Sequence, residues 1–239
     1  MQKLLLVSLM IFLTSAVYAQ DDSGGTSPTS GELLIEITSS PFGRDVNNFS
    51  SSSSTTLLNF GQFRARYFLT ETLVPRLGIW FSIDDNRDGM STPDVTQTIS
   101  QFMFTPGVEY HFINENGFTS YAALDIVISG RSVEQLSETD SDISGALPGS
   151  SDVSSIITQP NRSFSFDNRG FFGIGAMGAV GADYHFSSRF YMGAEIGFYF
   201  VTGKSSDVEI DGTLYQSGIK FFESGVKTSN SFRIGFKLL

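Results

Sequence analysis

The sequence predicts an all-β protein, a transmembrane antiparallel up-and-down β-barrel of about eight strands. Three observations support this prediction: an export signal opens the chain, apolar and polar residues alternate over most of the remainder, and long and short connections follow one another in strict order. Only helices and closed barrels satisfy every backbone group in lipid. No later segment has the run of about 18 apolar residues that a membrane helix needs, so a membrane-embedded chain of this kind must form a barrel.

Composition narrows the function classes. The chain has 239 residues, a length that suits one barrel domain. It carries 15 Lys and Arg against 25 Asp and Glu, and this acidic balance argues against a nucleic-acid partner, which requires a basic face. The absence of cysteine excludes disulfides, thiolate catalysis and cysteine-ligated metals.

Residues 1–19 have the pattern of a secretory signal peptide. Lys3 provides the positive charge, residues 4–13 form the apolar segment, and residues 17–19 read Val-Tyr-Ala, a small-residue cleavage site. The apolar segment is too short to span a bilayer, which takes about 20 residues, so a cleaved signal is favoured over an anchor. We therefore expect a flexible leader at 20–31 and the barrel domain at 32–239.

The strands are predicted from period-two alternation, which places every second side chain on one face. In the last segment Phe232, Ile234 and Phe236 alternate with Arg233 and Gly235. Runs of about ten residues suit tilted transmembrane strands. The eight expected strands lie near 32–43, 56–69, 73–84, 95–112, 117–130, 169–186, 189–203 and 227–239.

The connections between these strands alternate in length. Short turns are expected at 70–72, 114–117 and 187–188, and long polar segments at 44–55, 85–94, 131–168 and 204–226. This arrangement puts all long loops at one end and is typical of membrane barrels. A soluble sandwich or lipocalin-like binder is the main alternative fold, but its outward faces would not be so apolar.

Aromatic residues gather beside the short turns, where a girdle at the membrane interface is expected. Aromatic residues also favour strands in general, which is the plainer explanation. The girdle residues are Tyr67, Tyr110, Phe112, Tyr184, Phe186 and Phe190.

The turn-flanking blocks 110–112 (YHF) and 184–195 (YHFSSRFYMGAE), with the terminal block 232–239 (FRIGFKLL), resemble the small outer-membrane β-barrels of Gram-negative bacteria. These are the OmpA-like and OmpX-like eight-stranded barrels of the porin-like families. The likeness is one of pattern and covers nearly the whole mature chain, although such barrels usually end on an aromatic residue and this chain ends on Leu239. It implies a Gram-negative outer-membrane location, periplasmic short turns and external long loops. It also implies contact with outer-membrane lipid and lipopolysaccharide, and with the barrel assembly machinery during biogenesis.

If the apolar set faces lipid, the alternate set faces the lumen. An eight-stranded barrel is filled by side chains or holds one small ligand, and an unpaired buried ion costs several kcal/mol. We therefore predict a lumen plugged by paired charges, with a hydrated pore as the alternative. The predicted network consists of Glu36, Arg64, Arg66, Arg76, Glu109, Asp125, Asp183, Glu195, Arg233 and Lys237.

Two motifs suggest ligands. The spacing of Gly173, Gly175 and Gly178 matches a dinucleotide fingerprint, but that motif requires a following helix, and a strand is predicted here. Asp84, Asn86 and Asp88 match the start of a calcium loop. The acid expected at its twelfth position is absent, and an acidic hairpin explains the pattern equally well. Calcium is therefore a weak candidate, and no other cofactor is expected.

No catalytic residue is predicted, and the protein is not expected to be an enzyme. The two histidines, His111 and His185, lie beside short turns, and neither has a serine two residues away on the same strand face to activate, since Ser187 belongs to the expected turn at 187–188. The leading function is a structural or interaction role, with acidic loops displayed outward to an unidentified partner. The alternatives are a small porin-like channel for ions or small solutes and, more weakly, a lipid-modifying barrel enzyme.

Overall fold

The computed structural model describes residues 27–39, 60–88, 95–137, 141–147, 169–227 and 232–238. The predicted signal peptide, most of the leader, the whole of segment 44–55 and most of segment 131–168 lie outside these residues. Within the described part of the chain, no helix is long and apolar enough to cross a membrane.

Eight antiparallel strands form a closed ring, as the sequence predicts. Each strand pairs with the next in chain order, and the last pairs with the first through the register Leu34–Lys237 to Ser39–Phe232. The ring strands are β1 (Leu33–Ser39), β2 (Phe60–Tyr67), β3 (Leu73–Asp88), β4 (Val95–Glu115), β5 (Phe118–Ser137), β7 (Phe171–His185), β8 (Phe190–Ser205) and β12 (Phe232–Lys237).

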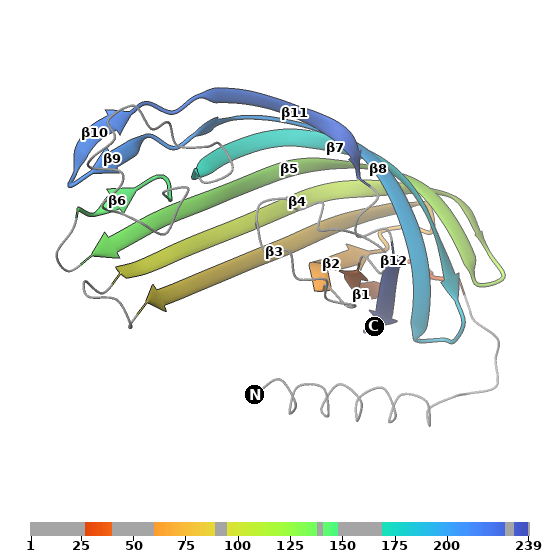
Figure 1. The fold of residues 1–239 in the computed structure, drawn as a ribbon. Helices are drawn as coiled ribbons and strands as arrows, with labels where there is room; N and C mark the ends of the chain where they lie inside the picture. The colour runs from red at the N-terminus through yellow and green to blue at the C-terminus, as the bar shows by residue number, and fades with distance from the viewer. Residues whose placement is uncertain are drawn as a thin grey trace.

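Four further strands lie in segments predicted as loops. They are β6 (Ile143–Ser144), β9 (Val208–Ile210), β10 (Thr213–Gln216) and β11 (Lys220–Lys227). β12 pairs with residues 190–194 of β8, near the β7–β8 turn, and β11 pairs with residues 197–204, farther along the same strand. Two strands therefore follow one another as neighbours of β8. The long strands β3, β4, β5, β7 and β8 extend well beyond the short β1, β2 and β12 (Figure 1).

Side chains alternate between the two faces of the wall, which gives the barrel a polar interior and an apolar exterior. On β3, Arg76 is buried inside, whereas Ile79, Phe81 and Ile83 are exposed outside. The same alternation runs along β5, β7 and β8. The period read from the sequence therefore assigns each residue to the lumen or to the outer surface.

Backbone conformation and side-chain hydrogen bonds stabilise two of the short turns. Asn116 and Gly117 both have positive φ, 51° and 76°, the backbone conformation that a tight Asn-Gly hairpin requires. In the β7–β8 turn, the Ser187 hydroxyl accepts hydrogen bonds from the backbone N–H groups of Arg189 and Phe190. Both turns therefore keep their strands in antiparallel register.

A short N-terminal segment, residues 27–32, crosses the end of the barrel that carries these turns; we call it the N-terminal strap. Its Pro28 carbonyl accepts a hydrogen bond from Asn114 Nδ2 (2.9 Å), and its Ser27 Oγ accepts one from the Gly117 N–H (3.0 Å). At the other end, the Gly31 N–H donates to the Phe68 carbonyl. Because the β4–β5 turn lies about half a ring away from β1, the strap spans the mouth of the barrel.

Candidate functional site

The lumen contains one continuous network of ionised side chains. Every strand of the eight-stranded ring contributes at least one member. Eight members are buried, and the side chain of Glu195 is only 8 % exposed. The nine members are Glu36, Arg64, Arg66, Arg76, Glu109, Asp125, Asp183, Glu195 and Arg233.

Arg66 is fully enclosed and contacts three carboxylates. Its Nη2 lies 2.6 Å from Glu109 Oε2, and its Nη1 lies 2.8 Å from Asp183 Oδ2. A longer contact of 3.5 Å joins Nη1 to Glu36 Oε2. One guanidinium therefore connects carboxylates from β1, β4 and β7, which face one another across the lumen.

Arg76 and Arg233 both contact Glu195 and so extend the network to strand β8. Arg76 Nη1 lies 2.6 Å from Glu195 Oε2 and 3.0 Å from Glu109 Oε1. The Arg76 guanidinium also donates hydrogen bonds to both carboxylate oxygens of Asp125. Arg233 binds Asp183 and, at 3.2 Å, Glu195 Oε2. The several donors of each guanidinium allow it to join more than one carboxylate.

Two tyrosines belong to the network although sequence reasoning did not select them. The Tyr121 hydroxyl donates to Glu195 Oε2 (2.9 Å), and its ring lies under the guanidinium of Arg66 at 5.1 Å. The Tyr191 hydroxyl donates to Glu36 Oε2 (2.8 Å). Both tyrosines belong to the inward-facing set of the alternation, and this signal was available from the sequence.

The two histidines stack on these tyrosines at the turn end of the lumen. His111 lies against Tyr121 with ring centroids 5.1 Å apart, and His185 lies against Tyr191 at 4.9 Å. His111 Nε2 also lies 2.9 Å from Glu109 Oε2. The two histidine–tyrosine pairs thus lie between the ionic network and the short turns.

Inward-facing glycines make room for the large side chains. A Cβ on Gly235 would collide with the ring of Tyr191, and one on Gly193 would collide with the carboxylate of Asp183. Gly107 has the same relation to Asp125. These three glycines are the direct strand partners of Tyr191, Asp183 and Asp125, so they leave space in the narrow lumen for those side chains.

Lys237 lies apart from the network. Its ammonium pairs with Glu32 of the N-terminal strap, and both side chains are partly exposed. The network itself has four arginines for five carboxylates.

The other predicted site residues lie outside the lumen or at its edge. Of the predicted girdle, Tyr67, Tyr110, Phe112, Tyr184 and Phe186 are exposed at the turn end, and Phe190 is half-buried. Asp84 and Asn86 belong to the extended strand β3 and pair in register with β4, so their backbone does not wrap around an ion. The described part of the chain contains no group of three His, Cys, Asp or Glu suited to a metal. Gly173, Gly175 and Gly178 lie within strand β7 and precede no helix.

Comparisons with known proteins give a likeness in structure and none in sequence. No protein-family model and no curated protein matches the sequence. The chain is similar in structure to the outer membrane protein OprG from Pseudomonas aeruginosa, with 13% sequence identity, a TM-score of 0.43, and coverage of 90% of this chain and 98% of that one. The fold assignment rests on the strand pairing described above. The molecule is an all-β protein whose eight ring strands close into an antiparallel barrel.

Proposed function

We propose that this protein is an outer-membrane β-barrel with a closed lumen, and that it acts as a structural or interaction component through its external loops. The observation that carries the proposal is the buried ionic network, to which all eight ring strands contribute. Partners during assembly and in the membrane would be the barrel assembly machinery, outer-membrane lipid and lipopolysaccharide, as the sequence resemblance implies.

An exposed apolar belt supports the membrane location. On β3 it runs from Leu73 to Ile83, and Phe81 and Ile83 are 70 and 71 % exposed. With a strand rise of about 3.4 Å and a tilt of about 40°, this stretch is about 25 Å tall. That height matches the apolar band of outer-membrane barrels, whereas such a belt in water would be an aggregation hazard.

The network also favours a closed lumen over a pore. Its guanidinium and carboxylate groups lie within 3.5 Å of one another across the barrel, so they fill the space that a hydrated passage would need. Each arginine is held by at least two acids. Opening a path would expose several charges at once, and each of them would need a new partner.

Planar-bilayer conductance of the refolded mature chain tests this proposal. We expect the native barrel to fold, as judged by heat-dependent gel mobility, and to stay electrically silent. Replacing both members of one buried pair, in Arg76→Ser with Asp125→Ser, should open steady channels because it removes two large side chains without changing the net charge.

The matched control replaces an exposed pair of the same chemistry. Lys204 Nζ and Asp207 Oδ1 lie 3.1 Å apart on the surface, with side chains 55 and 44 % exposed. Lys204→Ser with Asp207→Ser should remain silent. Steady openings of the native barrel would instead support the porin-like channel.

The lipid-modifying enzyme remains the weaker alternative. Both histidines are engaged with aromatic rings inside the lumen rather than at the lipid-facing surface. Incubation with outer-membrane lipid, followed by mass spectrometry, should show no product. A product that is lost in His111→Gln or His185→Gln would favour the enzyme. Calcium binding near Asp84 also stays a prediction, and calorimetric titration with Ca²⁺ checks it.

A further inference from the structure

Two lysines lie opposite each other on the outer wall of the barrel, near its loop end. Lys204 of β8 and Lys220 of β11 pair directly in register, so their side chains leave the same face of two adjacent strands, and both are exposed. Like charges placed directly opposite one another destabilise a sheet. The chain has 25 acids against 15 bases, so this pairing of two cations is an unfavourable arrangement that an anion from outside would relieve.

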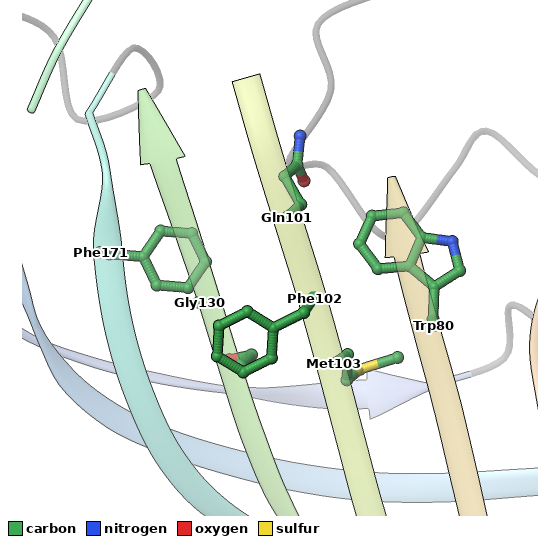
Figure 2. Close-up of a pocket in the computed structure, with 7 residues that line it drawn as sticks. Trp80, Gln101, Phe102, Met103, Gly130 and Phe171 are labelled. Carbon is green, nitrogen blue, oxygen red and sulfur yellow. The ribbon is translucent and has the colours of Figure 1, made fainter. Parts of the chain in front are cut away.

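The lysine pair ends a row of outward-facing residues that crosses the wall. Each member pairs directly with the next, in the order Phe81, Phe102, Gly130, Phe172, Lys204 and Lys220. Figure 2 shows the row at β4 and β5, where the Phe102 ring lies beside Gly130. The three phenylalanines are 70, 45 and 56 % exposed. The row therefore begins in the apolar belt and ends in two cations.

This row rises toward the loop end as it crosses the wall. Phe81 follows the first residue of β3 by eight positions, whereas Lys204 follows the first residue of β8 by 14. Both strands begin at short turns, so the lysine end of the row lies farther from those turns, as the tilt of strands in a barrel requires. The two lysines therefore lie at the loop-side edge of the belt.

Apolar side chains lie on the turn side of the lysine pair. On β8, Phe200 is 47 % exposed and precedes Lys204 by four residues, which is about 10 Å along the barrel axis at a rise of about 3.4 Å and a tilt of about 40°. On β11, Phe222 follows Lys220 by two residues and is 70 % exposed. Lipid headgroups begin at the edge of the hydrocarbon layer, so the lysine pair lies at headgroup level.

Both ammonium groups have hydrogen-bond donors to offer. Lys204 Nζ lies 3.1 Å from Asp207 Oδ1, in an exposed ion pair. That oxygen also accepts the Gly218 N–H at 2.6 Å, so the loop backbone holds Asp207 in place. An ammonium has three N–H donors, and this contact uses one of them. Among the described residues, no carboxylate forms an ion pair with Lys220.

We propose that Lys204 and Lys220 bind a phosphate group of a membrane lipid whose acyl chains lie against Phe172 and Phe222. The proposal rests on the outer-membrane location proposed above, in which the loop end faces outward. The lipid is then the phosphorylated glycolipid that anchors lipopolysaccharide. A phosphate monoester carries about two negative charges and accepts hydrogen bonds from both ammonium groups, which removes the repulsion between them.

Native mass spectrometry of the refolded barrel in a neutral detergent tests this site. The probe is diphosphoryl lipid A, and the paired probe is the same lipid after removal of its phosphates. We expect the native barrel to bind the phosphorylated lipid about tenfold more tightly, which is the gain typical of charge-assisted hydrogen bonds. Equal affinity for the two probes would show that only the acyl chains are recognised, and it would overturn the proposal.

Variants place the recognition at the lysine pair. Lys204→Gln with Lys220→Gln should lose the preference for the phosphorylated lipid, and Lys220→Gln alone should lose part of it. The matched control is Arg189→Gln, which removes an exposed cation beside the β7–β8 turn, at the other end of the barrel, and should keep the preference. If Arg189→Gln weakens binding as much as Lys220→Gln, the attraction comes from overall charge and the site is refuted.

A competition experiment separates a lipid from a free ion. Excess inorganic phosphate should displace little of the bound lipid A, because the acyl chains add apolar contacts that the ion lacks. Complete displacement by inorganic phosphate would overturn the lipid as the occupant.

Heat-dependent gel mobility of the same samples distinguishes failure of this site from failure of the proposed function. A barrel that folds and binds the two probes equally refutes the lipid site alone. A chain that does not fold in detergent or in lipid vesicles refutes the membrane barrel and, with it, the lipid site.

Discussion

At the residue scale, the lumen is held by charges that cannot be removed singly. Arg66 has an enclosed side chain in contact with acids from three other strands. Alternation places these charges on the inward face, where an ion in a narrow barrel must find a partner, but it also selects Lys237, which pairs with Glu32 of the N-terminal strap instead. The pairing itself could not be predicted, because it depends on how far each strand is staggered around the ring.

Arg66→Met should destabilise the barrel by about 3–5 kcal/mol, because it removes a buried cation and leaves three arginines to balance five buried carboxylates. Urea unfolding in lipid vesicles, followed by gel mobility, measures the change. Lys204→Met removes a cation of an exposed pair and should cost at most about 1 kcal/mol. Equal effects of the two substitutions would mean that the lumen charges are hydrated.

A second residue-scale prediction concerns the glycines. Gly235→Ala places a methyl group against the Tyr191 ring, which is hydrogen-bonded to Glu36, and should cost about 1–3 kcal/mol through overpacking. Gly178→Ala is the matched control on another strand, since nothing lies within 4 Å of its added Cβ. Unfolding midpoints in urea compare the two variants, and a tolerated Gly235→Ala would contradict the close fit.

At the element scale, the sequence predicts the ring strands well and the loop-side strands poorly. Strands β3, β4 and β5 were located because regular alternation extends over many residues. In β11, Phe221 and Phe222 are adjacent and break the alternation, so the sequence predicts a loop there. Strands β9 and β10 are only three and four residues long, which is too short for a period to be recognised.

The N-terminal strap gives an element-scale prediction. Because the chain lacks cysteine, introduced cysteines report without background. Pro28→Cys with Asn114→Cys, residues joined by a hydrogen bond, should be linked rapidly by a short bismaleimide in the folded barrel. Pro28→Cys with Ser188→Cys, in the β7–β8 turn, should react far more slowly. Mass spectrometry of the cross-linked peptide measures both, and equal rates would show that the strap does not hold its place.

At the scale of the whole molecule, two surfaces with opposite chemistry share one wall. Arg76 faces inward and Phe81 outward on the same strand, so a shift of one residue in register would exchange them. The outward-facing side chains form the apolar belt. Toward the loop end of the strands the outward side chains are more polar, as Ser132 and Glu134 on β5 show. The position of a residue along its strand therefore decides how it tolerates charge.

Leu124 and Leu136 test the extent of the belt, because both face outward on β5 and are 61 and 55 % exposed. Leu124→Arg, near the middle of the belt, should cost about 2–4 kcal/mol in lipid. Leu136→Arg, near the loop end of the strand, should cost little. Urea unfolding in vesicles measures both, and equal costs would contradict a belt that ends below Leu136.

The seam between β1 and β12 has a consequence for the order of events during folding. It joins the first and last strands of the ring, so the two partners are separated by almost the whole barrel sequence. Every other ring pair joins ring strands that follow one another along the chain, and such a pair can form as soon as both of its strands have been synthesised. The seam must wait for the final residues, so an unfinished chain presents two unpaired strand edges. Such edges bind other strands readily, and the interval before the seam closes is therefore when this chain is most exposed to aggregation.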